Sequence, residues 1–393
     1  MSGAIERVQA AFAHRAPDRT PLFEIFCTYH PIHWAICGRT VGTDQAMCWD
    51  AMADGISGDE LLEAHAQAAY RVNRFFGLDM VRLCGAPARE YTRPVKTGPD
   101  TWTRDGVEYA LNPRTQLIEL AHPGAADAYS RRVTEEQMRG WIAAWDGKPS
   151  TGAYATNPLT RRVRELAAAD GIEWVYMGEI GIGTGVAFYP PFMLEWMLTE
   201  PELFQRWLDM QRLSGLALTR ALIADGHTVI AMGGDVSADK GPFISPALYH
   251  EFILPVIQEH VQVIHDAGAL AVYTSDGNHW AIKDDFFFNS GIDGYKEVDH
   301  AAGMTFERLI AEGVKDRVCI IGNIDARFTL CLGTPEQVRD EVIARLRSGQ
   351  QTPGGHILHN SHSVHEDVKV ENYHAAVNAY RDYFGLSPLP SLA

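Results

Sequence analysis

The sequence predicts an α/β fold, a (β/α)8 barrel formed by a single domain that spans residues 1–393. Short apolar runs alternate with amphipathic helical patterns, eight such runs recur, and no linker rich in Pro, Gly or Ser divides the chain. Strands that alternate with helices pair in parallel, and eight units in one chain of this length favour a closed barrel over an open sheet. The predicted strands cover residues 21–26, 80–85, 173–183, 228–235, 269–277, 291–299, 317–325 and 354–361.

One segment, from about residue 86 to residue 150, interrupts this alternation. Within it, TRPVKTGPDTWTRDGVEYALNP combines turn residues with β-branched and aromatic residues, which is typical of paired antiparallel strands. EQMRGWIAAW, further along, has a helical pattern. We therefore expect a β-hairpin inserted after the second barrel strand, followed by a helix.

The composition limits the classes of partner. Asp and Glu number 50 against 34 Lys and Arg, which gives a net charge of -16. This charge argues against binding to nucleic acid and to an anionic membrane surface. The N-terminal MSGAIERVQAAFAHRAPDR lacks the apolar core of a signal peptide, and no run of 18 apolar residues occurs. The 6 cysteines include no CxxC pair. Reduced thiols in a cytoplasmic protein are the expected state.

Chemically reactive residues follow the predicted strands. In a barrel enzyme the loops after the strands form the mouth of the active site. Acids and histidines at so many consecutive strand ends favour an enzyme over a barrel that only binds a small molecule, although such a binding barrel stays an alternative. In chain order these residues are Cys27, His30, Arg82, Cys84, Glu179, Asp235, Ser275, Asp276, Glu297, Asp299, His300, Asn323, Asp325, His359 and His362.

Four histidines at a regular spacing of three occur in GGHILHNSHSVHED, residues 354–367. Side chains alternate between the two faces of a strand, so His356 and His359 cannot both face the barrel interior. We expect His356 to pack against neighbouring residues and His365 to lie in the loop. His362 is the strongest candidate for an acid or a metal ligand, and His359 is the second.

Four segments resemble the uroporphyrinogen decarboxylase superfamily, and within it the corrinoid-dependent methyltransferase branch, which includes O-demethylases. They are ERVQAAFAHRAPDRTPLFE, GGDVSADKGPFISPALYHEFILPVIQEHVQVIHDAGALAVYTSDGN, GNIDARFTLCLGTPEQVRDEV and GGHILHNSHSVHEDVKVENY. Together they extend over nearly the whole chain. The resemblance also implies a (β/α)8 barrel.

The chain departs from two motifs of that superfamily. Decarboxylase members carry an RQAGR-type loop after the first strand, whereas this chain reads FCTYHPIHWAICGRT, with Arg39 as its arginine. Methyltransferases acting on coenzyme M bind zinc through an H-x-C pair and a later cysteine. The corresponding positions here are Thr274, Ser275 and Asp276, and Ser361 or His362. Relatives that demethylate oxygen, and that can use carboxylates and a histidine, are therefore more similar.

The resemblance implies a methyltransferase that takes a methyl group from a small methoxylated or methylated compound and passes it to a corrinoid protein. No D-x-H-x-x-G motif occurs, so cobalamin would arrive on a separate partner. The resemblance further suggests zinc as a cofactor and a homodimer. The implied roles are zinc binding by Asp276, Glu297 and His362, catalysis by His362, Asp235 and Glu179, and substrate binding by Tyr29, His30, Arg82, Tyr189, Asn323 and His359.

Each of these sites has a structural alternative. Asp276 lies in SDGN, a sequence typical of a turn, and Glu297 can form a salt bridge with Lys296 or Lys283. Asp235 can bond the neighbouring glycine-rich backbone. The alternative activity is a metal-independent decarboxylase or lyase, in which Arg39 or Arg82 holds a substrate carboxylate and His362 is the general acid.

Overall fold

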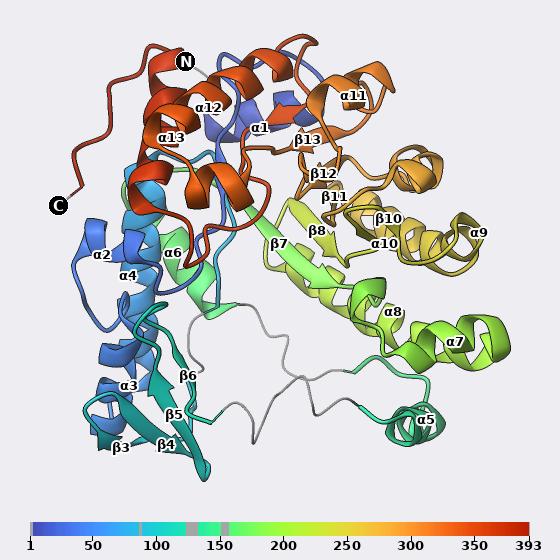
Figure 1. Cartoon of the computed structure of the whole chain (residues 1–393), viewed down its shortest axis with the longest axis horizontal. Coiled ribbons are helices and arrows are strands. Elements are labelled where there is room, and N and C mark those ends of the chain that lie inside the picture. Colours follow the sequence, from blue (N-terminus) through green and yellow to red (C-terminus); the bar gives the residue numbers. More distant parts are fainter. Residues whose placement is uncertain (1–2, 86–88, 123–132, 151–156, 393) are drawn as a thin grey trace.

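The computed structural model describes residues 3–85, 89–122, 133–150 and 157–392. Eight parallel strands pair in chain order at its centre, with helices around them (Figure 1). Bridges from Leu22 to Leu358 and from Phe26 to Val364 join the first strand to the last, so the sheet closes and confirms the predicted barrel. The strands are β1 (Phe23–Glu24), β2 (Met80–Val81), β7 (Val175–Gly181), β8 (Val229–Gly233), β11 (Leu270–Thr274), β12 (Gly294–Lys296), β13 (Cys319–Ile321) and β14 (His356–Ile357).

Apolar side chains fill the barrel interior toward the amino ends of the strands. They come from alternate positions of the strands, because side chains two residues apart on a strand point the same way. Phe23, Met80, Met177, Val272 and Ile357 belong to this cluster and are almost completely buried. This end of the interior is thus packed, which leaves the carboxyl ends of the strands as the place for a site.

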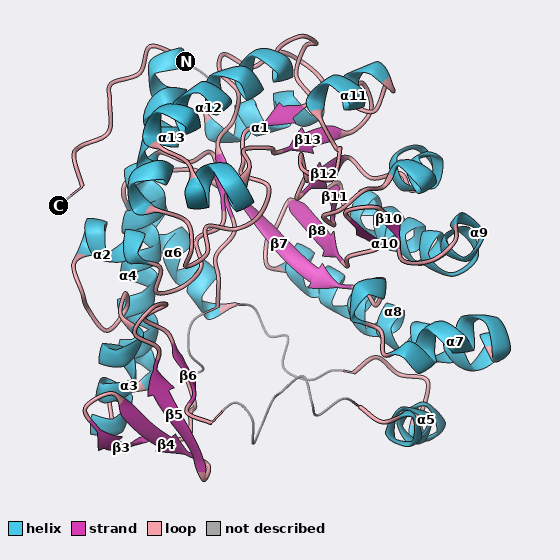
Figure 2. Cartoon of the chain, in the orientation of Figure 1, coloured by secondary structure: helices cyan, strands magenta, loops and turns pink. Residues whose placement is uncertain are grey.

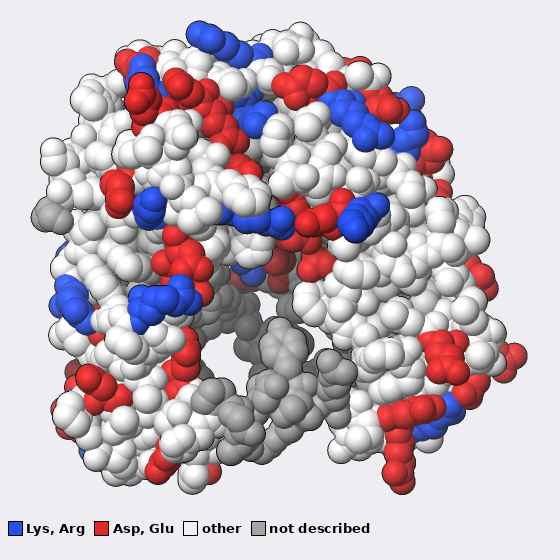
Figure 3. All heavy atoms as spheres, in the orientation of Figure 1, with Lys and Arg blue, Asp and Glu red and all other residues white. Residues whose placement is uncertain are grey.

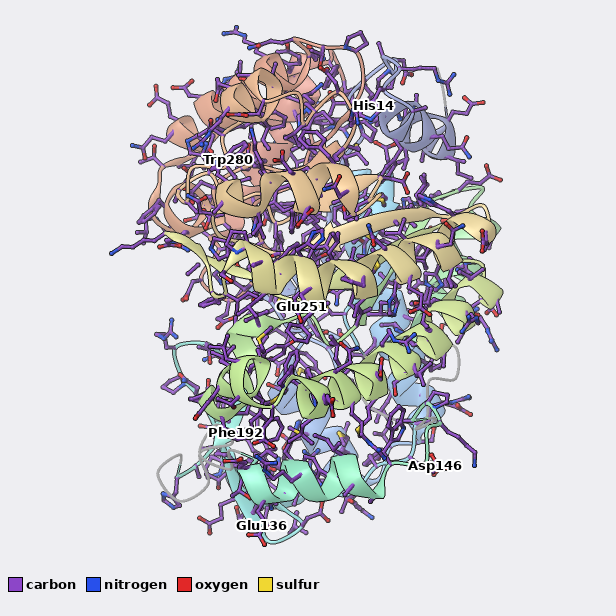
Figure 4. The ribbon with its side chains drawn as sticks, turned by 90° about the vertical axis from the view of Figure 1, so that its right-hand side faces the viewer. His14, Glu136, Asp146, Phe192, Glu251 and Trp280 are labelled. Atoms are coloured by element: carbon purple, nitrogen blue, oxygen red, sulfur yellow. The ribbon has the colours of Figure 1, made fainter. Side chains whose placement is uncertain are left out.

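Helices form the outer layer, and their starts carry the expected capping residues. Ser57 and Glu60 form a capping box at the start of the fourth helix, as Thr334 and Gln337 do at the start of the twelfth. Figure 4 shows one side of this layer. Among the described residues, no helix is both long and apolar enough to cross a membrane. The helices are α1 (Ala4–Phe12), α2 (Pro31–Cys37), α3 (Gln45–Asp54), α4 (Gly58–Phe76), α6 (Pro158–Ala169), α7 (Pro191–Thr199), α8 (Pro201–Ala224), α9 (Pro246–Leu248), α10 (Leu254–Asp266), α11 (Phe306–Ala311), α12 (Pro335–Gly349) and α13 (Val370–Tyr383).

The insertion after the second barrel strand is a four-stranded antiparallel sheet, larger than the predicted hairpin. Figure 2 shows it apart from the barrel strands. Trp102 of this sheet is fully buried, and its Nε1 donates a hydrogen bond of 3.0 Å to Asp50 of α3, which attaches the sheet to the barrel. The predicted helix is α5 (Glu135–Ala144), and a short ribbon of β9 (Ser237–Ala238) and β10 (Gly241–Pro242) follows β8. The inserted strands are β3 (Val95–Gly98), β4 (Thr101–Arg104), β5 (Val107–Leu111) and β6 (Ile118–Leu120).

Candidate functional site

Polar side chains line the barrel interior at the carboxyl ends of the strands, two residues beyond the apolar cluster. Met177 belongs to that cluster, so Glu179, two residues further along β7, faces the same interior. Acidic and basic side chains border the hollow at the centre of the face in Figure 3. The same step of two residues leads from Met80 to Arg82, from Gly294 to Lys296, from Ile321 to Asn323 and from Ile357 to His359.

Lys296 lies in the middle of this polar layer, and its side chain is 0% exposed. Its Nζ is 2.6 Å from Oε1 of Glu297 and 3.8 Å from Oε2 of Glu179. Nε of Arg82 approaches the same Glu179 oxygen at 2.9 Å. Two cations and two carboxylates thus form one network at the carboxyl ends of three strands. The sequence marked Lys296 only as a salt-bridge partner, yet its place two residues after Gly294 was a signal for an inward position.

Glu297 is the carboxylate held most firmly in the network. Burial opposes its ionisation, but the charge and hydrogen bond of Lys296, together with the charges of His362 and His359, outweigh burial, so the pKa of Glu297 is lowered. Its backbone has φ of 66°, a left-handed conformation that is uncommon for a residue other than glycine. The salt bridge with Lys296 is one of the two alternatives that the sequence left open for Glu297. Lys283 instead pairs with Glu312.

A cavity of about 1040 Å³ borders this network. Arg82, Glu179, Asp235 and Glu297 line its polar end, and the apolar wall includes Met138, Tyr189 and Trp207. Four predicted site residues and the predicted substrate-binding Tyr189 therefore share one space. A pocket with an apolar wall and a few convergent polar groups is the usual form of a small-molecule site.

Asp235 stands out electrostatically among the acids of this cavity. Burial and the negative charges of Asp276 and Glu297 raise the pKa of its carboxyl to about 6. The Asp276 backbone N–H donates a hydrogen bond to this carboxyl, and the Asp235 carbonyl accepts one from Ala187 at 2.9 Å. These partners are not the neighbouring glycines, so the bonding to the glycine-rich backbone that the sequence left as an alternative stays a prediction. The raised pKa also gives the side chain a proton to donate near neutral pH.

A second cavity, of about 600 Å³, lies beside the first and is strongly acidic. Asp276 and His362 both line it, next to Arg327. Burial, followed by the charges of Glu297 and Asp299, raises the pKa of Asp276. The other charged or titratable side chains that line this space are Asp299, Asp325, Cys331, His365 and Asp367.

The three predicted zinc ligands are near one another but do not form a ready site. Asp276 and His362 share the smaller cavity, while Glu297 lines the larger one and is bound by Lys296. Within the described parts of the chain, no three His, Cys, Asp or Glu side chains are placed so that they could hold a metal ion. Carboxylate and imidazole are suitable zinc ligands by type, so the mismatch lies in their placement.

The histidines of the last strand divide as the alternation predicts. His356 packs against Phe306, with its Nε2 2.8 Å from the carbonyl of Gly322, and burial lowers its pKa to about 3. His359 lies inside the barrel against Phe23. Its Nδ1 is 3.1 Å from Oε1 of Glu24, out of line for a hydrogen bond. Glu24, a buried acid that the sequence analysis did not single out, is therefore a charged neighbour of this histidine rather than its hydrogen-bond partner.

Three of the predicted substrate-binding residues are engaged in structural contacts. The Tyr29 hydroxyl is 2.8 Å from Nε2 of His65, and Nε2 of His30 is 2.9 Å from the carbonyl of Val368. Asn323 is fully buried, and its side-chain amide donates to the carbonyl of Met304 at 3.2 Å. None of the three is among the described residues that line either cavity. Their substrate-binding role stays a prediction.

Comparisons with known proteins agree with the barrel fold. The family model for uroporphyrinogen decarboxylase (URO-D) matches residues 190–383. The match covers just under half of the chain, so residues 190–383 are similar to that family. A methyltransferase from Methanosarcina mazei, a solved structure, superposes with a TM-score of 0.63 and 16% identity over 98% of this chain and 100% of that one. At this identity the match shows the fold alone.

Two kinds of curated protein are similar to parts of this chain. The methylcobamide:CoM methyltransferase MtaA of Methanosarcina barkeri is 24% identical over 216 residues, 53% of this chain and 57% of the relative. A uroporphyrinogen decarboxylase of Chlorobium phaeobacteroides is 33% identical over 132 residues, 32% of this chain and 34% of the relative. The chain thus aligns with little more than half of the first relative's length and about a third of the second's.

Proposed function

We propose that the protein is a methyltransferase that removes a methyl group from a small methoxylated or methylated compound and transfers it to a corrinoid protein. The carrying observation is a cavity with an apolar wall whose polar end holds Asp235, a carboxyl with a pKa of about 6. The similarity to a methylcobamide:CoM methyltransferase supports methyl transfer over other reactions of the superfamily.

The residues at the polar end of the cavity suit the removal of a methyl group from oxygen. The departing oxygen is a poor leaving group unless it is protonated or bound to a Lewis acid as the carbon–oxygen bond breaks. Asp235, partly protonated near neutral pH, can supply that proton from the carboxyl oxygen. The Met138, Tyr189 and Trp207 wall excludes water and holds the apolar part of the substrate. Lys296 forms an ion pair with Glu297 and also lies near Glu179.

The cofactor and partners of this reaction are part of the proposal. A separate corrinoid protein would accept the methyl group at the mouth of the barrel. Zinc, where bound, would supply a Lewis acid for the departing oxygen. Asp276 and His362 are the predicted ligands that share a cavity, and Glu297 would first have to leave Lys296. No step above depends on zinc.

Anaerobic incubation with cob(I)alamin and a panel of methoxylated and methylated compounds tests the function. We expect methylcobalamin to form, as followed by its absorbance, and to be lost in Asp235→Asn. Glu251→Gln is the matched control, because Glu251 is exposed on the outer wall of the barrel (Figure 4) and should leave the rate unchanged. Failure of every compound with wild-type protein, or equal rates in both variants, would contradict the proposal.

Elemental mass spectrometry of protein purified without chelator tests the zinc component separately. If the predicted ligands bind zinc, wild-type protein should contain about one zinc ion per chain, and Asp276→Ala and His362→Ala should both lose it. Metal-free wild-type protein that still forms methylcobalamin would show that the reaction needs no zinc. Protonation of the departing oxygen would then be the mechanism that remains.

The decarboxylase alternative fits the arginines less well. Arg39 is 53% exposed and pairs with Asp44 at 2.5 Å, and Arg82 pairs with Glu179. Both guanidinium groups are therefore already engaged by carboxylates of the chain. Release of CO2 from a small acid in the absence of cob(I)alamin would nevertheless put decarboxylation in place of methyl transfer.

A further inference from the structure

Two cysteines lie opposite each other where the first two barrel strands end. Phe23 pairs with Met80 and Glu24 with Val81, and the same register places Cys27 opposite Cys84. The register continues beyond the strands, because the Thr28 hydroxyl donates to the carbonyl of Gly85 at 3.2 Å. Neighbouring strands are roughly 4.8 Å apart, close to the Cα separations that a disulfide spans.

The two thiols also meet. The Cys27 and Cys84 side chains are joined by a hydrogen bond, and Sγ of Cys27 is 3.6 Å from Oγ of Ser363. Both cysteines are half-buried, whereas Cys48, Cys319 and Cys331 are buried. Solvent therefore reaches a pair of thiols that are already in contact, at the mouth of the barrel.

The environment makes the two sulfurs unequal. The hydrogen bond from Cys84 is the main reason that the pKa of Cys27 falls to about 6, against the opposing effect of burial. The same interaction, followed by burial, raises the pKa of Cys84. Cys27 is then the thiolate and Cys84 the neighbouring thiol, which is the arrangement of an attacking and a resolving cysteine.

We propose that Cys27 and Cys84 form a redox-active dithiol that a hydroperoxide converts to an intrachain disulfide. The Cys27 thiolate attacks one peroxide oxygen, the oxygen–oxygen bond breaks, and Cys27 becomes a sulfenic acid while the other oxygen leaves as water or an alcohol. The Cys84 sulfur then attacks Cys27, the sulfur–oxygen bond breaks, and water leaves. The two thiols supply the two electrons that reduce the peroxide. A small dithiol then reduces the disulfide back to the two thiols.

This modification site is independent of the proposed methyl transfer. A disulfide between Cys27 and Cys84 would link the segment that follows β1 to the segment that follows β2, next to Ser363. Arg82, which lines the larger cavity, lies two residues before Cys84. Oxidation would therefore act on the wall of the site without changing any of the residues to which a catalytic role is assigned.

Intact-mass measurement and peptide mapping of the full chain, before and after hydrogen peroxide, test the proposal. Wild-type protein should lose the mass of two hydrogens, yield a linked peptide pair containing Cys27 and Cys84, and regain both thiols with dithiothreitol. Cys37→Ser should behave the same way, because Cys37 is an equally half-buried cysteine on α2. Cys27→Ser and Cys84→Ser should form no such link.

Alkylation rates add a measurement that does not depend on oxidation. Iodoacetamide should modify Cys27 in wild-type protein with a pH midpoint near 6, and Cys84→Ala, which removes the donor, should move that midpoint upward. Thermal melts would show that each variant is folded. Oxygen addition to the two cysteines without a link, a link to another cysteine, or an unchanged midpoint in Cys84→Ala would each overturn the proposal.

Discussion

Replacing Lys296 with methionine is expected to lower the free energy of unfolding by about 3–5 kcal/mol. Lys296 is completely buried, and its Nζ is 2.6 Å from the carboxylate of Glu297. Methionine keeps most of the volume but leaves that carboxylate charged in a buried place without its cation. The cost of removing one partner of a buried pair is mainly this uncompensated charge.

Urea denaturation of three variants measures the effect. Lys283→Met is the matched control, because Lys283 and Glu312 are also 2.6 Å apart but about a third exposed. Such an exposed pair contributes little to stability, because water screens the two charges. Lys296→Met combined with Glu297→Gln should recover part of the loss, since the buried charge is gone. Equal losses for Lys296→Met and Lys283→Met would contradict the role of burial.

The sequence predicted the barrel because its signals are local. Each of the eight predicted strands contains an observed strand, from Phe23–Glu24 to His356–Ile357. Turn residues and apolar runs mark these places regardless of distant contacts. The inserted sheet was predicted only as a hairpin, because the segment taken as two strands holds three short ones, and the fourth strand, Ile118–Leu120, has few residues and little alternation of its own.

The candidate site was predicted less completely, because it depends on which strand-end residues turn inward. Counting in steps of two from a buried apolar residue finds Glu179 and Lys296, and this rule is available in the sequence. It fails where the chain leaves the strand. Tyr29 has φ of 69°, and His30 then begins α2 by accepting a hydrogen bond from Ile32, so both depart from the alternation.

The sequence does not give the distances between side chains that follow different strands of the barrel. The zinc prediction placed Asp276, Glu297 and His362 together because all three follow strands. Whether their ligand atoms converge depends on loop conformation and on competing partners, and Lys296 is such a partner for Glu297. The contact between Cys27 and Cys84 likewise needs the register of two strands that are more than fifty residues apart in the chain.

Replacing Asp235 with asparagine is expected to stabilise the protein at neutral pH. The carboxyl has an ordinary pKa of 3.8 and a folded-state pKa of about 6. Below pH 3.8 it is protonated in both states and asparagine changes little. As pH rises from 3.8 to 6, the unfolded chain ionises first, so folding loses stability. Above pH 6 the full penalty applies, and solvent screening of this partly exposed carboxyl limits it to about 1–2 kcal/mol.

Chemical denaturation of wild-type protein and Asp235→Asn at pH 4 and pH 8 checks this sign. The variant should be close to wild type at pH 4 and exceed it by about 1–2 kcal/mol at pH 8. Asp239→Asn is the control, because Asp239 is 65% exposed and should change stability little at either pH. A destabilised or pH-independent Asp235→Asn would contradict the raised pKa. Stabilisation together with loss of methyl transfer would show that the fold retains this costly carboxyl for its chemistry, since a residue kept for stability could not produce that combination.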